Sequence, residues 1–280
     1  MKSMPRCLEY GLLLSALLAF GGCASQGAGA PGVAGLDTQG LVRLVASPDR
    51  NPQDRTLDAR RHPVELLNFI GVRPGMTVLD ISAGGGYTTD LLARAVGTAG
   101  HVYGQSAPPA AAKSATASEK PASATTFSAG PGPQRRSSAE ALAERALKPR
   151  TANIVPVVRP FDDLVPEELA DAKLDLATLM FNYHDLGHLG VDRAKLNEAV
   201  FKALKPGGLY VIADHAGRPG TGISESGTLH RIEESFLRQE VEAAGFKLAA
   251  EGQFLRNPAD PRDGSPVDAK DEFVLKFVKP

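Results

Sequence analysis

The stretch VLDISAGGGY (residues 78–87) decides the fold, because an apolar run ends in an aspartate and leads into three consecutive glycines. The turn pair Pro74-Gly75 precedes this stretch, and a helical pattern from about residue 88 to 96 follows it. Glycines at such a turn let the backbone approach a ligand at distances where a Cβ atom would collide. A strand that ends in this way is typical of the ligand-binding edge of a parallel sheet.

Strand and helix patterns alternate on both sides of this stretch. We expect strands at 76–81, 101–105, 153–158, 174–181, 209–214, 246–254 and 272–278. We expect helices at 63–70, 88–96, 139–147, between 192 and 206, and at 228–244. This order predicts a mostly parallel sheet covered on both faces, with ligands at the carboxyl ends of the strands.

Two other nucleotide-binding motifs do not fit the glycine-rich turn. A dinucleotide fingerprint would need glycine at 82, 84 and 87, and the chain has Ser82, Gly84 and Tyr87. The Gly-Lys-Ser/Thr of a phosphate-binding loop is missing as well. A turn without any ligand is the remaining alternative.

Residues 80–86 resemble motif I of the class I S-adenosylmethionine-dependent methyltransferases, an acidic residue followed by Gly-x-Gly-x-Gly. LKPGGLYV (204–211), EAAGF (242–246) and the strand at 273–278 are similar to later elements of that family. The resemblance runs from Gly71 to Pro280. It implies a Rossmann-like class I methyltransferase α/β fold: a mostly parallel seven-stranded sheet, the last strand antiparallel, with helices on both faces.

The resemblance also implies a reaction, in which an acceptor attacks the sulfonium methyl of S-adenosylmethionine in line. The protein then mainly positions the nucleophile and sometimes removes its proton. The acceptor, a small molecule or another group, is left open. The implied cofactor-binding residues are Asp80, Ser82, Ala83, Gly84, Gly86, Gln105, Asp162 and Asn182.

Two of these residues depart from the family pattern. Ser82 replaces the first glycine of motif I, and Gln105 stands where an acidic residue usually binds the ribose. A glutamine amide still bonds a hydroxyl, but without the strength of a charged acceptor. The departures favour an alternative, a non-catalytic binding or scaffold lipoprotein on a degenerate methyltransferase fold. Asp162 has a second interpretation too, as part of a solvated acidic turn.

Polar residues follow the fourth and fifth expected strands. His184 is the candidate general base, because an ordinary histidine pKa near 6.5 suits that role. Asp185 would orient His184 or bind the acceptor, and Asp214 and His215 are further catalytic candidates on the same edge. The alternative is that local hydrogen bonds satisfy these histidines.

The same residues suggest a third interpretation, a divalent metal held by His184, His188 and the nearby aspartates. Gly187 argues against a regular helix that presents both histidines, so we predict no metal site. His230 is expected on the helix at 228–244, in a structural role.

The N-terminus predicts export. Lys2 and Arg6 precede an apolar run at 11–20, which is too short to span a bilayer, and Gly21-Gly22-Cys23 follows. Residues 1–23 thus resemble a bacterial lipoprotein signal, with a lipid on Cys23 and a place on the periplasmic side of the envelope. Simple secretion and a buried N-terminal helix are the alternatives. The only other cysteine, Cys7, would leave with the signal, which excludes disulfides and zinc–thiolate sites from the mature domain.

Three regions follow from these patterns: the signal at 1–23, a tether and N-terminal extension at 24–61, and the methyltransferase-like domain at 62–280. Within the extension, residues 36–61 are polar, and we expect them to be irregular. Residues 106–136 are rich in Ala, Ser, Pro, Thr and Gly, so we expect a low-complexity insertion there. The net charge of −1 gives no reason to expect nucleic acid as a partner.

Overall fold

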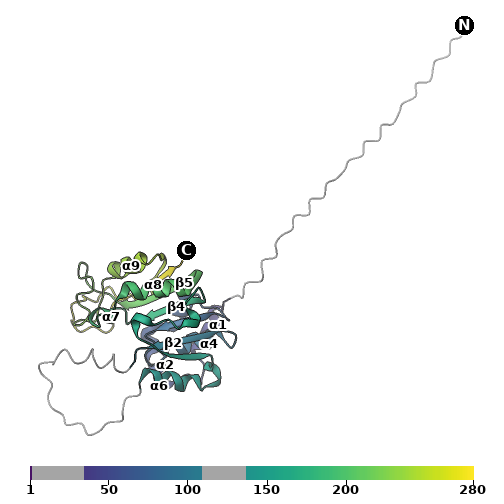
Figure 1. The fold of residues 1–280 in the computed structure, drawn as a ribbon, viewed down its shortest axis with the longest axis horizontal. Coiled ribbons are helices and arrows are strands. Elements are labelled where there is room, and N and C mark those ends of the chain that lie inside the picture. The colour runs from purple at the N-terminus through teal and green to yellow at the C-terminus, as the bar shows by residue number, and fades with distance from the viewer. Residues whose placement is uncertain (2–34, 109–136) are drawn as a thin grey trace. The chain divides into compact units, whose positions relative to one another are not determined.

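The computed structural model describes residues 1, 35–108 and 137–280 (Figure 1). The expected lipoprotein signal, the tether up to residue 34 and most of the expected insertion at 106–136 lie outside the described residues. The fold below is that of the compact unit that begins at Val33. In its described part, no helix combines the length and apolar character needed to cross a membrane.

A seven-stranded sheet in the order β3-β2-β1-β4-β5-β7-β6 forms the centre of this unit (Figure 1). All pairings are parallel except those of β7, which runs antiparallel to both β5 and β6. This confirms the expected class I methyltransferase sheet. The strands are β1 (Thr77–Ile81), β2 (His101–Ser106), β3 (Ile154–Val158), β4 (Leu174–Met180), β5 (Leu204–His215), β6 (Lys247–Gly252) and β7 (Glu272–Val278).

Helices cover both faces of the sheet, as predicted. They are α1 (Thr38–Val45), α2 (Pro52–Arg61), α3 (Pro63–Ile70), α4 (Tyr87–Val96), α6 (Ser138–Ala146), α7 (Asp185–His188), α8 (Arg193–Ala203) and α9 (Glu234–Ala243), with 3-10 turns η1 (Pro149–Thr151), η2 (Phe161–Asp163) and η3 (Glu167–Leu169). Successive residues of β1 enter opposite cores, because side chains alternate along a strand. Val78 packs with α1, α3 and α4, whereas Leu79 packs with α8 and α9.

The prediction of an irregular segment from 36 to 61 is wrong for two stretches, which form α1 and α2. Asp37 caps α1 by accepting the amide of Gly40 at 2.7 Å, and Asn51 caps α2, which has proline at its first position. The only buried residue of α2 is Asp54. A helix that buries a charged residue shows no apolar stripe, and sequence periodicity therefore missed it.

The helix expected at 228–244 begins only at Glu234. Ile232 instead forms a parallel bridge with Ala216, beyond the end of β5. His230 lies in this connecting loop with φ +52°, not on a helix. The helix-like spacing of Leu229, Ile232 and Phe236 misled the prediction, because tertiary pairing outweighs a short apolar pattern.

Candidate functional site

The glycine-rich loop follows β1, which lies between β2 and β4 at the point where the strand order reverses. Three contacts hold its backbone. The amides of Ser82 and Ala83 donate to the side chain and backbone oxygens of Gln105, at 2.9 and 2.8 Å. Arg145 of α6 donates to the carbonyl of Gly85 at 2.7 Å. The loop is therefore fixed from two sides while its outer surface stays open.

A cavity of about 290 Å³ lies over this loop and is bounded by α2 and the end of β4. A Cβ atom at Gly85 would have no neighbour within 4 Å, and one at Gly84 would meet only a backbone oxygen at 3.9 Å. Of the predicted cofactor residues, the cavity is lined by Asp80, Ser82, Ala83 and Gly84. The loop thus presents bare backbone to a space that a ligand can enter.

Gly86 faces elsewhere. A Cβ atom there would lie 2.7 Å from the side chain of Arg145, and its φ is +82°. Its glycine character therefore serves the packing of α6 and the turn into α4, and the predicted contact with a cofactor does not fit this position.

Asp80 is buried at the end of β1 and accepts the hydroxyls of Thr89 and Thr178, at 2.6 and 2.7 Å. Burial raises its pKa to about 6, although both hydroxyl bonds act in the opposite direction. Both carboxylate oxygens are occupied by protein donors. Asp80 therefore ties β1 to α4 and β4 beneath the cavity floor.

Gln105 and Asp162 do not take their predicted places. The fully buried amide of Gln105 accepts from the backbone of Ser82 and donates to the carbonyl of Arg159 at 2.7 Å, so both of its ends are used within the protein. Asp162 is exposed on η2 and does not line the cavity. The sequence identified the end of β2 correctly but gave no sign of where the glutamine side chain turns.

Arg61, the last residue of α2, is a site residue that the sequence did not reveal. Its guanidinium lies 3.6 Å from the ring centroid of Phe181 and lines the same cavity. Burial lowers its pKa to about 10, which leaves it cationic at neutral pH, and its Nε has no hydrogen-bond partner within the described residues. A cation in this position favours an anionic ligand group.

Buried ion pairs hold α2 over the loop. Asp54 accepts two hydrogen bonds from Arg145, at 2.7 and 2.9 Å, so that one arginine joins α2, α6 and the loop carbonyl. Asp58 accepts from Arg50 and from the hydroxyl of Tyr87 at the start of α4. Breaking such pairs strands a buried charge, so α2 is fixed rather than loosely attached.

A line of polar side chains leads from the loop to the ends of β4 and β5. The Ser82 hydroxyl bonds the side chain oxygen of Asn182, whose amide donates to Asp185 at 2.6 Å. Asn182 therefore connects the glycine-rich loop with the predicted acceptor side instead of facing the cavity.

His184 lies between two carboxylates. Its Nδ1 is 2.6 Å from Asp214, and its Nε2 is 3.1 Å from Asp185. Burial lowers the His184 pKa, but the bonds to Asp185 and Asp214 outweigh that effect and raise it to about 9. The pKa of Asp185 falls to about 2, because its contacts with His184 and His230 outweigh burial. A cationic ring with both nitrogens engaged does not fit the predicted role of general base.

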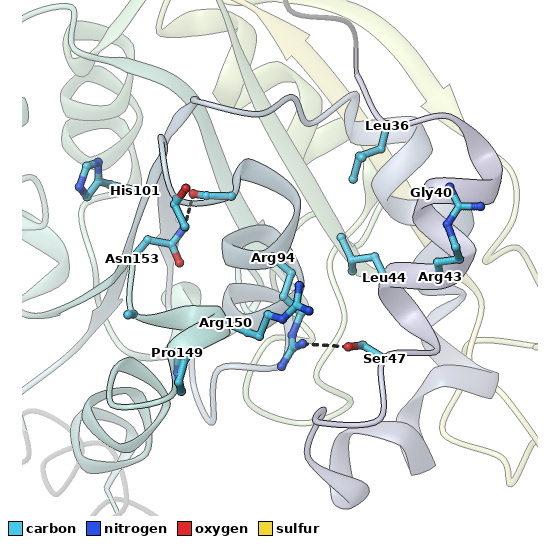
Figure 2. Close-up of a pocket in the computed structure, with 13 residues that line it drawn as sticks. Leu36, Gly40, Arg43, Leu44, Ser47, Arg94, His101, Pro149, Arg150 and Asn153 are labelled. Atoms are coloured by element: carbon cyan, nitrogen blue, oxygen red, sulfur yellow. Dashed lines mark hydrogen bonds between the residues drawn. The ribbon is translucent and has the colours of Figure 1, made fainter.

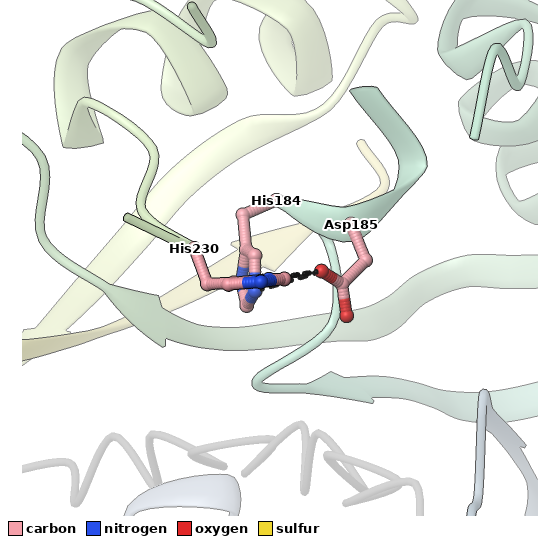
Figure 3. A group of neighbouring side chains, drawn as sticks. All are labelled: His184, Asp185 and His230. Atoms are coloured by element: carbon pink, nitrogen blue, oxygen red, sulfur yellow. Dashed lines mark hydrogen bonds and ion pairs between the residues drawn. The ribbon is translucent and has the colours of Figure 1, made fainter. Parts of the chain in front are cut away.

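Four of the six histidines gather here. The ring of His215 lies 5.5 Å from that of His184, and its Nδ1 is 3.0 Å from Glu272. His188 bonds the hydroxyl of Ser226 at 3.0 Å. His230 approaches Asp185 at 2.9 Å, so that His184, Asp185 and His230 converge (Figure 3). Local hydrogen bonds thus satisfy His184, as the alternative interpretation of the sequence expected, whereas Nδ1 of His215 has no hydrogen-bond partner within the described residues.

A larger cavity of about 600 Å³ lies at the opposite edge of the sheet (Figure 2). Its lining includes His101, the first residue of β2, Asn153 just before β3, and Arg43 of α1. Arg94 also faces this space and is already paired with Asp90 and Asp49, at 2.6 and 3.0 Å. None of the residues predicted to bind the cofactor or to act in catalysis lies here.

Comparisons with known proteins agree with this geometry. The model of the protein-L-isoaspartate(D-aspartate) O-methyltransferase family matches residues 47–123, which is less than half of the chain. No curated protein sequence matches the chain. A methyltransferase structure from Aquifex aeolicus, described as SAM-dependent, is 17% identical with TM-score 0.55, and the match covers 88% of this chain and 100% of that one.

A second similar structure is geranyl diphosphate C-methyltransferase from Streptomyces coelicolor A3(2), solved with Mg²⁺, geranyl diphosphate and S-adenosyl-L-homocysteine. It is 14% identical with TM-score 0.52, and the match covers 85% of this chain and 89% of that one. At these identities the similarity concerns the fold. The described chain therefore has the Rossmann-like fold of S-adenosylmethionine-dependent methyltransferases, with its open glycine loop at the edge where that fold binds ligands.

Proposed function

We propose that the protein is an S-adenosylmethionine-dependent methyltransferase whose donor binds over the loop at 82–86. The open backbone at Gly84 and Gly85, at the switch point of the sheet, is the observation that carries this proposal. The family match over residues 47–123 supports it, because that span includes α2, β1 and the loop.

The residues around the cavity suit the amino-acid end of the donor. Arg61 offers a carboxylate its guanidinium, whose Nε has no hydrogen-bond partner within the described residues, and the backbone at Gly84 and Gly85 permits close approach. When bound, S-adenosylmethionine supplies an electrophilic methyl group on a sulfonium. The chain itself then binds the donor, excludes water with α2 and aligns the acceptor, since alignment is the main contribution to such a transfer.

The acceptor side lies at the ends of β4 and β5, around His184, Asp185, Asp214 and His215. In this proposal His184 positions Asp185 by charge and does not remove a proton. The acceptor is a small molecule or another group, and nucleic acid is not expected. An acceptor screen begins with an isoaspartyl peptide, because the matching family model is named for that substrate.

Calorimetric titration with S-adenosylmethionine and S-adenosylhomocysteine tests the donor site. We expect saturable binding of one molecule per chain. No binding at millimolar ligand would remove the methyltransferase proposal.

A binding or scaffold protein is the second candidate. Both ends of the Gln105 side chain are hydrogen-bonded within the protein, and this position offers no acidic group to the ribose. This candidate predicts a folded protein with a cooperative unfolding transition that binds neither donor nor product. The same titration, combined with thermal unfolding, separates the two functions.

We further propose that the chain is exported and anchored by a lipid on Cys23, on the periplasmic side of a bacterial envelope. The charged, apolar and small residues before Cys23 support this. Cys23→Ser should move the protein from the membrane fraction to the soluble fraction and remove the lipid mass, whereas Cys7→Ser should change neither. A Cys23→Ser protein that keeps its lipid would contradict the anchor.

A further inference from the structure

His184, Asp185 and His230 place three ligand atoms within 4.8 Å of one another (Figure 3). The atoms are Nε2 of His184, one carboxylate oxygen of Asp185 and Nδ1 of His230. The Asp185 oxygen lies 3.1 Å from the first nitrogen and 2.9 Å from the second. Ligand atoms on one metal ion with bonds of about 2.1 Å lie about 3 Å apart. The two separations from the Asp185 oxygen match that spacing, and the two histidine nitrogens lie within 4.8 Å of each other.

We propose that these three residues bind a divalent transition-metal ion, contrary to the sequence-based prediction of no metal site. Binding releases the proton from Nε2 of His184, because histidine binds a metal only as the neutral imidazole. Two imidazoles and one carboxylate suit iron, cobalt, nickel or zinc, whereas magnesium and calcium prefer oxygen ligands alone. The inference does not depend on methyl transfer, since the site binds metal whether or not a donor is present.

Buried partners orient the first two ligands. Asp214 is fully buried and engages Nδ1 of His184, which directs Nε2 of that ring toward Asp185. The Asp185 oxygen nearest the histidines contacts the two proposed histidine ligands, and the other oxygen accepts from Asn182 at 2.6 Å. A metal ion would replace the contacts of the first oxygen and leave the bond to Asn182 in place. Such outer partners fix tautomer and orientation at metal sites.

The third ligand is held by its neighbours in the chain. Arg231 is buried, donates to the carbonyl of Ala216 and pairs with Asp260 at 2.8 Å. Ile232 bonds the carbonyl of His215. His230 itself is kept in the left-handed region at φ +52°, a conformation that costs a non-glycine residue free energy and persists only where its surroundings enforce it.

The site is closed on one side and open on the other. His184 is 2% exposed, whereas the Asp185 and His230 side chains are 23% and 52% exposed. An ion can enter from the His230 side and keep positions for water or another ligand. Of the other two histidines in the cluster, His188 bonds Ser226 while its Nδ1 lies 3.8 Å from the same Asp185 oxygen, and His215 lies beside Glu272.

Cobalt(II) is the probe for the test, because its visible spectrum reports both binding and ligand type. The protein is the full chain without an affinity tag, with Cys7→Ser and Cys23→Ser so that no thiolate contributes. We expect one Co²⁺ per chain, displaced by Zn²⁺, with visible bands of nitrogen and oxygen ligation.

His230→Ala and Asp185→Asn should each weaken binding by about 100-fold. Both side chains are partly exposed, so these variants should fold, which circular dichroism checks. His101→Ala and His62→Ala, which change histidines outside the cluster, should bind as tightly as the parent. Lack of saturable Co²⁺ binding, or equal affinity in the folded His230→Ala variant, would overturn the site, and neither result bears on binding of the methyl donor.

Discussion

The two edges of the sheet carry cavities of opposite character. The cavity at the carboxyl edge is the smaller, about 290 Å³ against about 600 Å³. It is lined by bare glycine backbone and by Arg61, whose Nε has no hydrogen-bond partner in the described part of the chain. The cavity at the amino edge is lined by Arg94, which is paired with Asp90 and Asp49, and by Arg43 and Arg150. Volume therefore does not locate the site. The direction of the strands locates it, because ligands of open parallel sheets bind in the loops at the carboxyl ends of the strands.

The largest difference between the two edges should appear when each cavity receives a leucine. Gly85→Leu places a side chain in open space, and Gly85 lacks the left-handed φ of Gly84, so the change adds no backbone strain. We expect loss of S-adenosylmethionine binding by at least about 100-fold, measured by calorimetry. Thr98→Leu, at an exposed position of the larger cavity, should leave the affinity unchanged.

A graded series sharpens this test. Gly85→Ala should lower affinity less than Gly85→Leu, because the loss follows the volume added to the cavity. Equal losses at residues 85 and 98 would erase the distinction between the edges.

The second prediction compares the pH dependence of stability due to the buried carboxyl group of Asp80, at the floor of the smaller cavity, with that due to an exposed carboxyl group. The folded pKa of Asp80 is about 6, above its ordinary value of 3.8, so the folded state holds the proton more tightly than the unfolded state. The stability that this group contributes is complete below pH 3.8 and is lost as the pH rises through 6.

Asp80→Asn should remove that loss. The free energy of unfolding of the variant, relative to the parent, should rise by about 2 kcal/mol between pH 4 and pH 7 in urea titrations. Asp162→Asn, which alters an exposed carboxylate, is the matched control and should follow the parent at every pH. Parallel curves for Asp80→Asn and the parent would show that Asp80 titrates as a solvated group.

The smallest expected effect distinguishes the arginines of the two edges. Arg61→Met should weaken S-adenosylmethionine binding about tenfold, since a hydrogen bond to a charged group at a partly open site contributes about 1.5 kcal/mol. The same variant should bind 5′-methylthioadenosine, which has no carboxylate, as the parent does. Arg43→Met at the other edge should alter neither ligand. An equal loss for both ligands in Arg61→Met would mean that Arg61 shapes the cavity and does not pair with the carboxylate.

Sequence patterns correctly predicted those parts of the fold in which the local strand and turn preferences agree with the tertiary packing. VLDISAGGGY (78–87) and LKPGG (204–208) combine apolar strands with glycines whose turns need them, as at Gly207 with φ +75°. The sheet and the carboxyl edge followed from these. Asp185, Asp214 and His215 were brought together because parallel strands end at one edge.

The remaining parts depended on where long side chains turn. Arg145 comes from α6 and reaches Gly85, 60 positions earlier in the chain, and no pattern encodes that reach. Arg61 follows a helix without an apolar stripe. The pKa of His184 depends on carboxylates from two segments at once, so its residue type alone suggested a base where the fold makes a cation.

The order β5-β7-β6 also constrains the time course of folding. On the ribosome β6 is completed before β7, its only strand partner in the described sheet, has been synthesised. Until residues 272–278 emerge, β5 lacks its antiparallel neighbour and β6 has nothing to pair with. The nascent chain therefore finishes its sheet late, by inserting the last strand between two earlier ones, and such long-range closure is slow compared with helix formation.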